Sequence, residues 1–195
     1  QDPNGHWVYS VPVAYSDELI LRTQYDHNWI EGTYRAGHEI FLQVLDESLV
    51  EKAHITLTSG FMDGWGSQTG FSTNMEGADW SPNNPDIQPG DTILGMVDGG
   101  TFTAQVKIGT ITANLDLDAD IVNGTVDAGW LVQTGKIRVS CEIWQENSPQ
   151  NQEYWVLPNG SDTYTCDWTS EDYDLNETSN LMVAYFEPLG HEVIG

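Results

Sequence analysis

Apolar and polar residues alternate along many short stretches of this chain, and turn-forming residues separate the stretches. Residues 38–46 and 136–144 are the clearest examples. Ile, Leu, Val or Cys occupies positions 40, 42 and 44 in the first stretch and positions 137, 139, 141 and 143 in the second. This period of two predicts β-strands, because successive side chains of a strand point to opposite faces. No long stretch has the period of a helix, so the pattern predicts an all-β protein.

Further short strands are predicted around these two. In the first half they cover residues 52–59, 70–73, 92–97 and 101–107, and in the second half residues 153–157, 164–168, 181–187 and 191–194. Pro-Gly-Asp at 89–91 and Pro-Asn-Gly-Ser at 158–161 are typical of turns between strands.

A duplication organises these elements. Residues 25–37 (YDHNWIEGTYRAG) align without a gap with residues 117–129 (LDADIVNGTVDAG), at an offset of 117 − 25 = 92 residues. A long predicted strand follows each copy. About seven short strands in each unit of roughly 90 residues are typical of an immunoglobulin-like sandwich. We therefore predict two tandem Ig-like antiparallel β-sandwiches, domain 1 at residues 18–108 and domain 2 at residues 109–195.

The pattern D-x-(D/N)-x-(I/V)-x-G-T-x-x-A-G is shared by both copies, and the chain also has a PGD turn and a closing hairpin that ends in GHEV. Together these motifs resemble the tandem bacterial Ig-like domains (immunoglobulin/fibronectin-III-like β-sandwiches) of large secreted or cell-surface proteins. The resemblance covers residues 18–195. It implies an exported, modular, structural or adhesive protein, and it brings no catalytic residues with it.

Residues 1–17 lie outside both copies and form an N-terminal arm. A mobile tail is normally polar, whereas this arm is rich in large apolar residues, so we expect it to pack as an extended strand. Those residues are Trp7, Val8, Tyr9, Val11, Val13 and Tyr15. The second copy also ends sooner than the first, which predicts an incompletely covered sheet edge there. An arm and an open edge favour strand donation between subunits, although the arm could instead pair with its own first domain.

The chain is strongly acidic, with 6 Lys plus Arg, 30 Asp plus Glu and a formal net charge of −24. Such a surface repels phosphate backbones and anionic lipids, which argues against nucleic acid and membrane partners and leaves proteins, glycans and cations. It would also suit high salt, where self-repulsion is screened. No apolar run approaches the about 20 residues of a membrane helix.

Several features indicate export. The chain begins at Gln1 without Met or a leader, as expected of a mature secreted or cell-surface product. Cys141 and Cys166 fall in separate predicted strands, and in an exported protein such a pair predicts a disulfide, with two buried thiols as the alternative.

Metal and catalytic chemistry receive little support. Asp116, Asp118 and Asp120 resemble the start of a calcium loop, but Ile121 occupies the position that requires Gly. We favour the polar face of a strand whose other face places Leu117 in the core, and calcium at a domain junction stays open. The histidines lack zinc-protease spacing, and no nucleophile elbow or phosphate loop is present, so we predict no cofactor and no enzyme.

The sequence also contains candidate sites for attaching glycans and for binding them. Asn123, Asn159 and Asn176 begin Asn-x-Ser/Thr acceptors, and Asn159 is placed at an exposed hairpin tip. Trp65 and Trp80 lie in the Gly- and Asn-rich stretch 60–89 and are candidate sugar contacts. The sequence thus predicts a structural surface protein, a fibre subunit (a pilus-like filament of copies of itself) or an adhesive stalk joined to other surface proteins. The alternative is a carbohydrate-binding module of a secreted protein.

Overall fold

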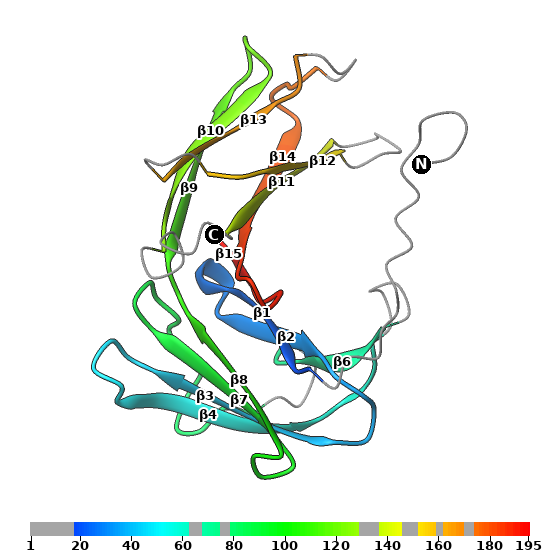
Figure 1. Ribbon diagram of the computed structural model, residues 1–195, viewed down its shortest axis with the longest axis vertical. Helices are drawn as coiled ribbons and strands as arrows, with labels where there is room; N and C mark the ends of the chain where they lie inside the picture. Colours follow the sequence, from blue (N-terminus) through cyan, green and yellow to red (C-terminus); the bar gives the residue numbers. More distant parts are fainter. Residues whose placement is uncertain are drawn as a thin grey trace.

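The computed structural model describes residues 18–62, 68–74, 79–128, 137–145, 152–158, 162–169 and 174–195. In these ranges the chain forms β-strands joined by turns, with one short 3-10 turn, η1 (Tyr25–His27) (Figure 1). The predicted all-β class is confirmed. None of the helical structure in the described part of the chain is long and apolar enough to cross a membrane.

The described strands form three sheets. The eight-stranded sheet has the order β12 (Gln152–Val156), β11 (Arg138–Gln145), β14 (Ser179–Phe186), β15 (Glu192–Ile194), β1 (Ile20–Gln24), β2 (Trp29–Thr33), β6 (Gln68–Ser72) and β5 (Gly60–Met62). The four-stranded sheet has the order β4 (Glu51–Thr58), β3 (Glu39–Leu45), β7 (Thr92–Val97) and β8 (Phe102–Lys107). The three-stranded sheet has the order β13 (Thr163–Asp167), β10 (Ile121–Asp127) and β9 (Thr110–Asp116).

The two halves of the chain pair their strands in the same order. In the first half β3 lies between β4 and β7, and β7 pairs with β8; in the second half β11 lies between β12 and β14, and β14 pairs with β15. Likewise, β2 lies between β1 and β6, as β10 lies between β9 and β13. The strand pairing therefore repeats along with the aligned sequences.

The aligned glycines explain part of this repeat. Gly32 lies opposite Phe71 of the neighbouring strand, and Gly124 lies opposite Tyr164. A Cβ at either glycine would collide with that aromatic ring and with a backbone oxygen of the other neighbouring strand. Each glycine thus leaves room for the aromatic ring of the neighbouring strand.

One sheet nevertheless joins the two halves. β1 pairs in parallel with β15, so that Arg22 lies beside Glu192 and Gln24 beside Ile194. The buried hydrophobic cluster also contains side chains from both halves. The domain boundary predicted between residues 108 and 109 stays a prediction, since neither the sheet nor the cluster divides there.

Two sequence expectations need correction. The edge of the second half that we expected to be uncovered is occupied by β1, because β15 pairs with it. Leu117 is 37% exposed instead of lying in the core. β9 ends at Asp116, whose Oδ1 accepts the N–H groups of Asp118 and Ala119 and so turns the chain before the alternating pattern can continue as a strand.

Candidate association surfaces and the seam between the halves

The predicted disulfide is present. Cys141 lies in β11 and Cys166 in β13, and their bond closes a sequence separation of 25 residues. Both cysteines are fully buried, and the bond ties the eight-stranded sheet to the three-stranded sheet. A loop of this size corresponds to about 3 kcal/mol of stabilisation in the chain-entropy account.

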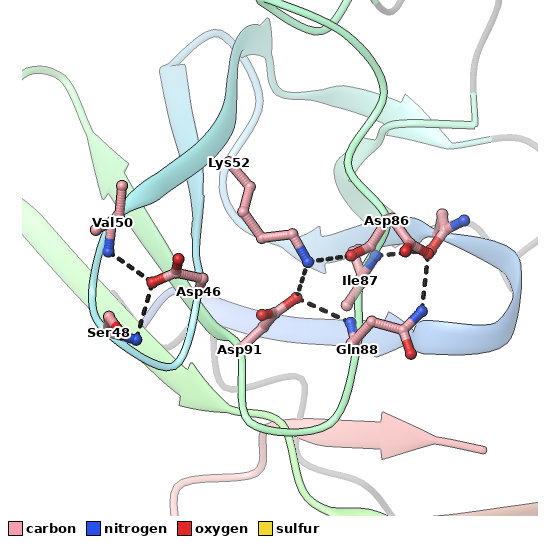
Figure 2. A network of polar contacts seen from close by, with 9 residues as sticks. Asp46, Ser48, Val50, Lys52, Asp86, Ile87, Gln88 and Asp91 are labelled. Carbon is pink, nitrogen blue, oxygen red and sulfur yellow. Dashed lines mark hydrogen bonds and ion pairs between the residues drawn. The ribbon is translucent and has the colours of Figure 1, made fainter.

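A polar network fixes the turn that carries the Pro-Gly-Asp sequence (Figure 2). Lys52 Nζ donates to Asp91 Oδ2 at 2.7 Å and to the main-chain oxygen of Asp86. The Gln88 N–H donates to the same Asp91 oxygen at 2.9 Å. Asp91 is only 4% exposed, so its charge requires these partners. One of the six basic residues is thereby committed to holding a turn against β4.

The segment before this turn covers the outer edge of β4. His54 and Ser81 exchange two main-chain hydrogen bonds of 2.8 and 2.9 Å. Farther along, the Ile87 N–H donates to Asn28 Oδ1 at 2.8 Å and the Ile87 side chain is fully buried. Edge strands invite pairing with other chains, and this segment occupies the outer edge of β4 at His54.

The structure places only part of the predicted ligand surface. Trp80 is half-buried and packs against the hydrophobic cluster. Trp65 lies outside the described residues, as do all six apolar residues of the N-terminal arm. Sugar binding by the two tryptophans stays a prediction.

The hairpin between β3 and β4 has an apolar tip. Asp46 Oδ1 accepts the N–H groups of Ser48 and Val50 at 2.8 and 2.9 Å (Figure 2). Between them Leu49 has a φ of 61°, a left-handed conformation that is uncommon for leucine. Leu49 and Val50 are 66% and 60% exposed. The tip therefore presents two apolar side chains on an acidic surface.

Charged groups hold the seam between β1 and β15. Arg22 bonds Glu31 Oε1 through Nη1 at 3.1 Å and lies 3.0 Å from Glu192 Oε2 through Nε. Its guanidinium also lies 5.8 Å from the centre of the Trp29 ring. Burial raises the pKa of Glu192 to about 7, against the opposing effect of Arg22. Burial likewise raises the pKa of Glu31, which Arg22 opposes.

A buried histidine completes the seam. His191 is 3% exposed, and its Nδ1 accepts the Leu21 N–H at 3.2 Å. Burial lowers the pKa of His191, which keeps the accepting nitrogen unprotonated; nearby Glu18 acts in the opposite direction. The GHE sequence around His191 predicts only a turn. It cannot reveal the contact with the Leu21 N–H, because Leu21 is 170 positions away in the sequence.

Two tyrosine hydroxyls form hydrogen bonds with the chain where β8 ends and β9 begins. The Tyr185 hydroxyl accepts the Gly109 N–H at 2.6 Å and lies 3.4 Å from the Lys107 carbonyl oxygen. The Tyr25 hydroxyl, from the first half, donates to the Ile111 carbonyl oxygen at 3.2 Å. Burial raises the pKa of both phenols, so they stay protonated donors across the physiological range.

The three candidate glycan acceptors differ in their surroundings. Asn123 lies on the exposed face of β10. Asn176 is half-buried, and its Oδ1 accepts both the N–H and the hydroxyl of Thr178 at 2.9 and 2.6 Å. Asn159 lies outside the described residues.

Two of the three aspartates considered for calcium accept main-chain hydrogen bonds. Asp116 caps the turn after β9, and Asp120 Oδ1 accepts the Leu175 N–H at 2.8 Å. Within the described ranges, no group of three or more His, Cys, Asp or Glu side chains is placed to hold a metal ion.

Comparison with known proteins gives little beyond this. No family model matches the chain, and no curated protein matches it. A solved structure of a tetra-tandem repeat in the extending region of a large adhesion protein is similar over 86% of this chain, with 13% identity and a TM-score of 0.31. The matched part is 44% of that chain. The function must therefore be argued from the residues of this chain.

Proposed function

We propose that this chain is an extracellular structural module, without enzymatic activity, of an adhesive stalk or fibre. Its two repeated units would be Ig-like sandwiches that associate with further copies by β-strand addition, with residues 1–17 as the donor strand. The buried disulfide supports an oxidising compartment, and the charge of −24 supports a role that requires neither nucleic acid nor anionic lipid.

The observation that carries strand addition is the pairing of β1 with β15. In the second half, the last strand of the repeat receives a parallel partner along its outer edge. In the first half, β8 occupies the same place in the repeated order, and it is the end strand of its sheet as described. The edge of β8 is thus the counterpart of an edge that accepts a strand, whereas the β4 edge of the same sheet is bridged by Ser81 at His54.

The backbone of β8 is oriented for this pairing. Ile108 lies opposite Asp91, and its N–H donates to the Asp91 oxygen at 2.8 Å. Along an antiparallel pair the N–H groups alternate in direction, so those of Thr103 and Gln105 point away from β7. The side chains of both residues are exposed. An added strand would find main-chain donors there.

Proline scanning of this edge tests the proposal. Thr103→Pro and Gln105→Pro each remove one outward N–H and leave the β7 ladder in place, since proline is tolerated on edge strands. We expect the wild-type protein to form larger species as its concentration rises in sedimentation velocity. Either proline, or deletion of residues 1–17, should weaken that association at least tenfold. Thr103→Val keeps the N–H and is the matched control.

Circular dichroism would verify that each variant is folded. A wild-type protein that stays monomeric at every concentration would refute strand addition. Association that survives both prolines but not the deletion would place the acceptor on another edge and so overturn the assignment to β8.

A further inference from the structure

The middle of the outer face of the three-stranded sheet is an array of small polar side chains. Two cross-strand rows follow from the register, and every member is a threonine or an asparagine. One row is Thr112, Thr125 and Thr163, and the other is Asn114, Asn123 and Thr165. All are exposed except Thr163, which is half-buried. On a chain of charge −24 this face carries neither acid nor base in its two central rows.

Hydrogen bonds between neighbouring strands fix the array. The Thr112 and Thr125 hydroxyls are 2.8 Å apart, and the Thr165 hydroxyl donates to Asn123 Oδ1 at 2.8 Å. Beneath the face, Tyr164 packs across Gly124 and Cys166 joins the disulfide. Side-chain hydrogen bonds therefore link all three strands across this face.

The corresponding face of the first half is built differently. The repeat offset and register match Asn123 to Glu31 and Asn114 to Arg22. Where the first half has a largely buried ion pair, the second has two exposed amides. The ion pair of the first copy has no counterpart in these two rows of the second, although Asp116, Asp127 and Asp167 flank the rows on the same face.

Asn123 occupies the middle position of its row and begins the Asn-Gly-Thr acceptor. The Asn123 side chain is exposed, and its Oδ1 accepts the Thr165 hydroxyl, so the amide is held at the centre of the array. We propose that Asn123 carries an N-linked glycan and that its first sugars lie on this Thr/Asn face. Threonine hydroxyls and the Asn114 amide there offer both donors and acceptors to sugar hydroxyls.

The modification is a glycosyl transfer with an activated sugar phosphate as co-substrate. A bond forms between Asn123 Nδ2 and the anomeric carbon of the sugar, and the bond from that carbon to the phosphate oxygen breaks. The phosphate leaves with the electron pair, and Nδ2 loses one proton to a base of the transferase. Reaction before folding would leave the sugar on the outer face once β10 pairs.

The spacing of basic residues makes the test sharp. Trypsin cuts after Lys107, Lys136 and Arg138, so peptide 108–136 contains Asn123 and no other acceptor, and peptide 139–195 contains Asn159 and Asn176. The native protein would be digested, and fragmentation that retains glycans would locate any added mass. We expect most copies of peptide 108–136 to carry sugar on Asn123. An unmodified 108–136 peptide would overturn the proposal.

Variants made in the native host test two claims separately: that Asn123 carries a glycan, and that this glycan lies on the Thr/Asn face. Asn123→Gln should remove the mass from peptide 108–136, and Asn176→Gln should leave that peptide unchanged. Thr165→Val keeps the acceptor sequence and removes the bond to Oδ1. It should leave occupancy unchanged and increase several-fold the rate at which periodate oxidises the glycan of the folded protein. Equal rates for wild type and Thr165→Val would refute the seating on this face.

Discussion

At the scale of single residues, two of the six basic side chains contact buried or half-buried carboxylates. Arg22 lies between Glu31 and Glu192, and Lys52 contacts Asp91. A carboxylate removed from water needs a partner or becomes protonated, so these contacts allow acids to lie inside a very acidic protein. Burial nevertheless prevails at two glutamates. It raises the pKa of Glu187 to about 7, and it raises the pKa of Glu192 to about 7 in spite of Arg22.

Glu187→Gln should therefore stabilise the protein at high pH. A carboxyl whose pKa is raised in the folded state favours folding below its unfolded pKa, and this contribution is lost as the pH rises through about 7. Glutamine keeps the shape of the protonated acid at every pH. We expect the variant to melt a few degrees above wild type at pH 8 and close to wild type at pH 5.

Thermal melts monitored by circular dichroism would check this, with Glu177→Gln as the control because Glu177 is exposed. A gain of the same size at pH 5 and pH 8 would contradict the assignment to Glu187 ionisation.

At the scale of elements, the repeat depends on a glycine under an aromatic ring. In each half the glycine belongs to the middle strand of three, and the ring comes from the third strand. Because the ring occupies the place of the missing side chain, the spacing of the three strands depends on that one position.

Alanine at these positions should be costly. Gly32→Ala and Gly124→Ala would each force a methyl group into a ring and a backbone oxygen. Overpacking of this kind costs about 1 to 3 kcal/mol, and the backbone contact favours the upper end. Gly60→Ala is the matched control, because nothing lies within 4 Å of the place that an alanine methyl group would take there.

Urea unfolding would measure these changes. The urea concentration at the unfolding midpoint should fall for Gly32→Ala and Gly124→Ala, and it should stay near the wild-type value for Gly60→Ala. If all three behave alike, the ring contacts do not set the sheet geometry.

Local patterns predicted the strands well and their partners poorly. The alternation at residues 92–97 gives the bounds of β7, and the matched Gly32 and Gly124 predicted equivalent strands. The alternating pattern gave a wrong prediction at Leu117 because the Asp116 side chain accepts a hydrogen bond from the Asp118 N–H and turns the chain there. The pairing of β1 with β15 has no local signature, since its two strands are short and lie at opposite ends of the described chain.

The seam residues were missed for the same reason. Arg22 and His191 each belong to an ordinary alternating strand or turn when their own neighbours are considered. Their roles appear only when β1 and β15 are side by side. A signal was present in the scarcity of basic residues, because an Arg within an apolar strand of so acidic a chain needs a reason.

At the scale of the whole molecule, the seam decides whether the halves behave as one unit. Only three residue pairs join β1 to β15. Around them lie the contacts of Arg22 with Glu192, of His191 with Leu21 and of Tyr25 with Ile111, each of which joins the first half to the second. The hydrophobic cluster is continuous across the same boundary.

Calorimetry should consequently record one unfolding transition for the wild-type protein, with a van't Hoff enthalpy equal to the calorimetric enthalpy. His191→Phe removes the acceptor of the buried Leu21 N–H, at a cost of about 1 to 3 kcal/mol, while retaining an aromatic ring. His191→Asn keeps a side-chain acceptor near the same place. If the seam couples the halves, His191→Phe should split or broaden the transition and His191→Asn should restore a single one. Two transitions in the wild-type protein would instead show that the repeats unfold separately, and the shared sheet would then be a contact between two independent units.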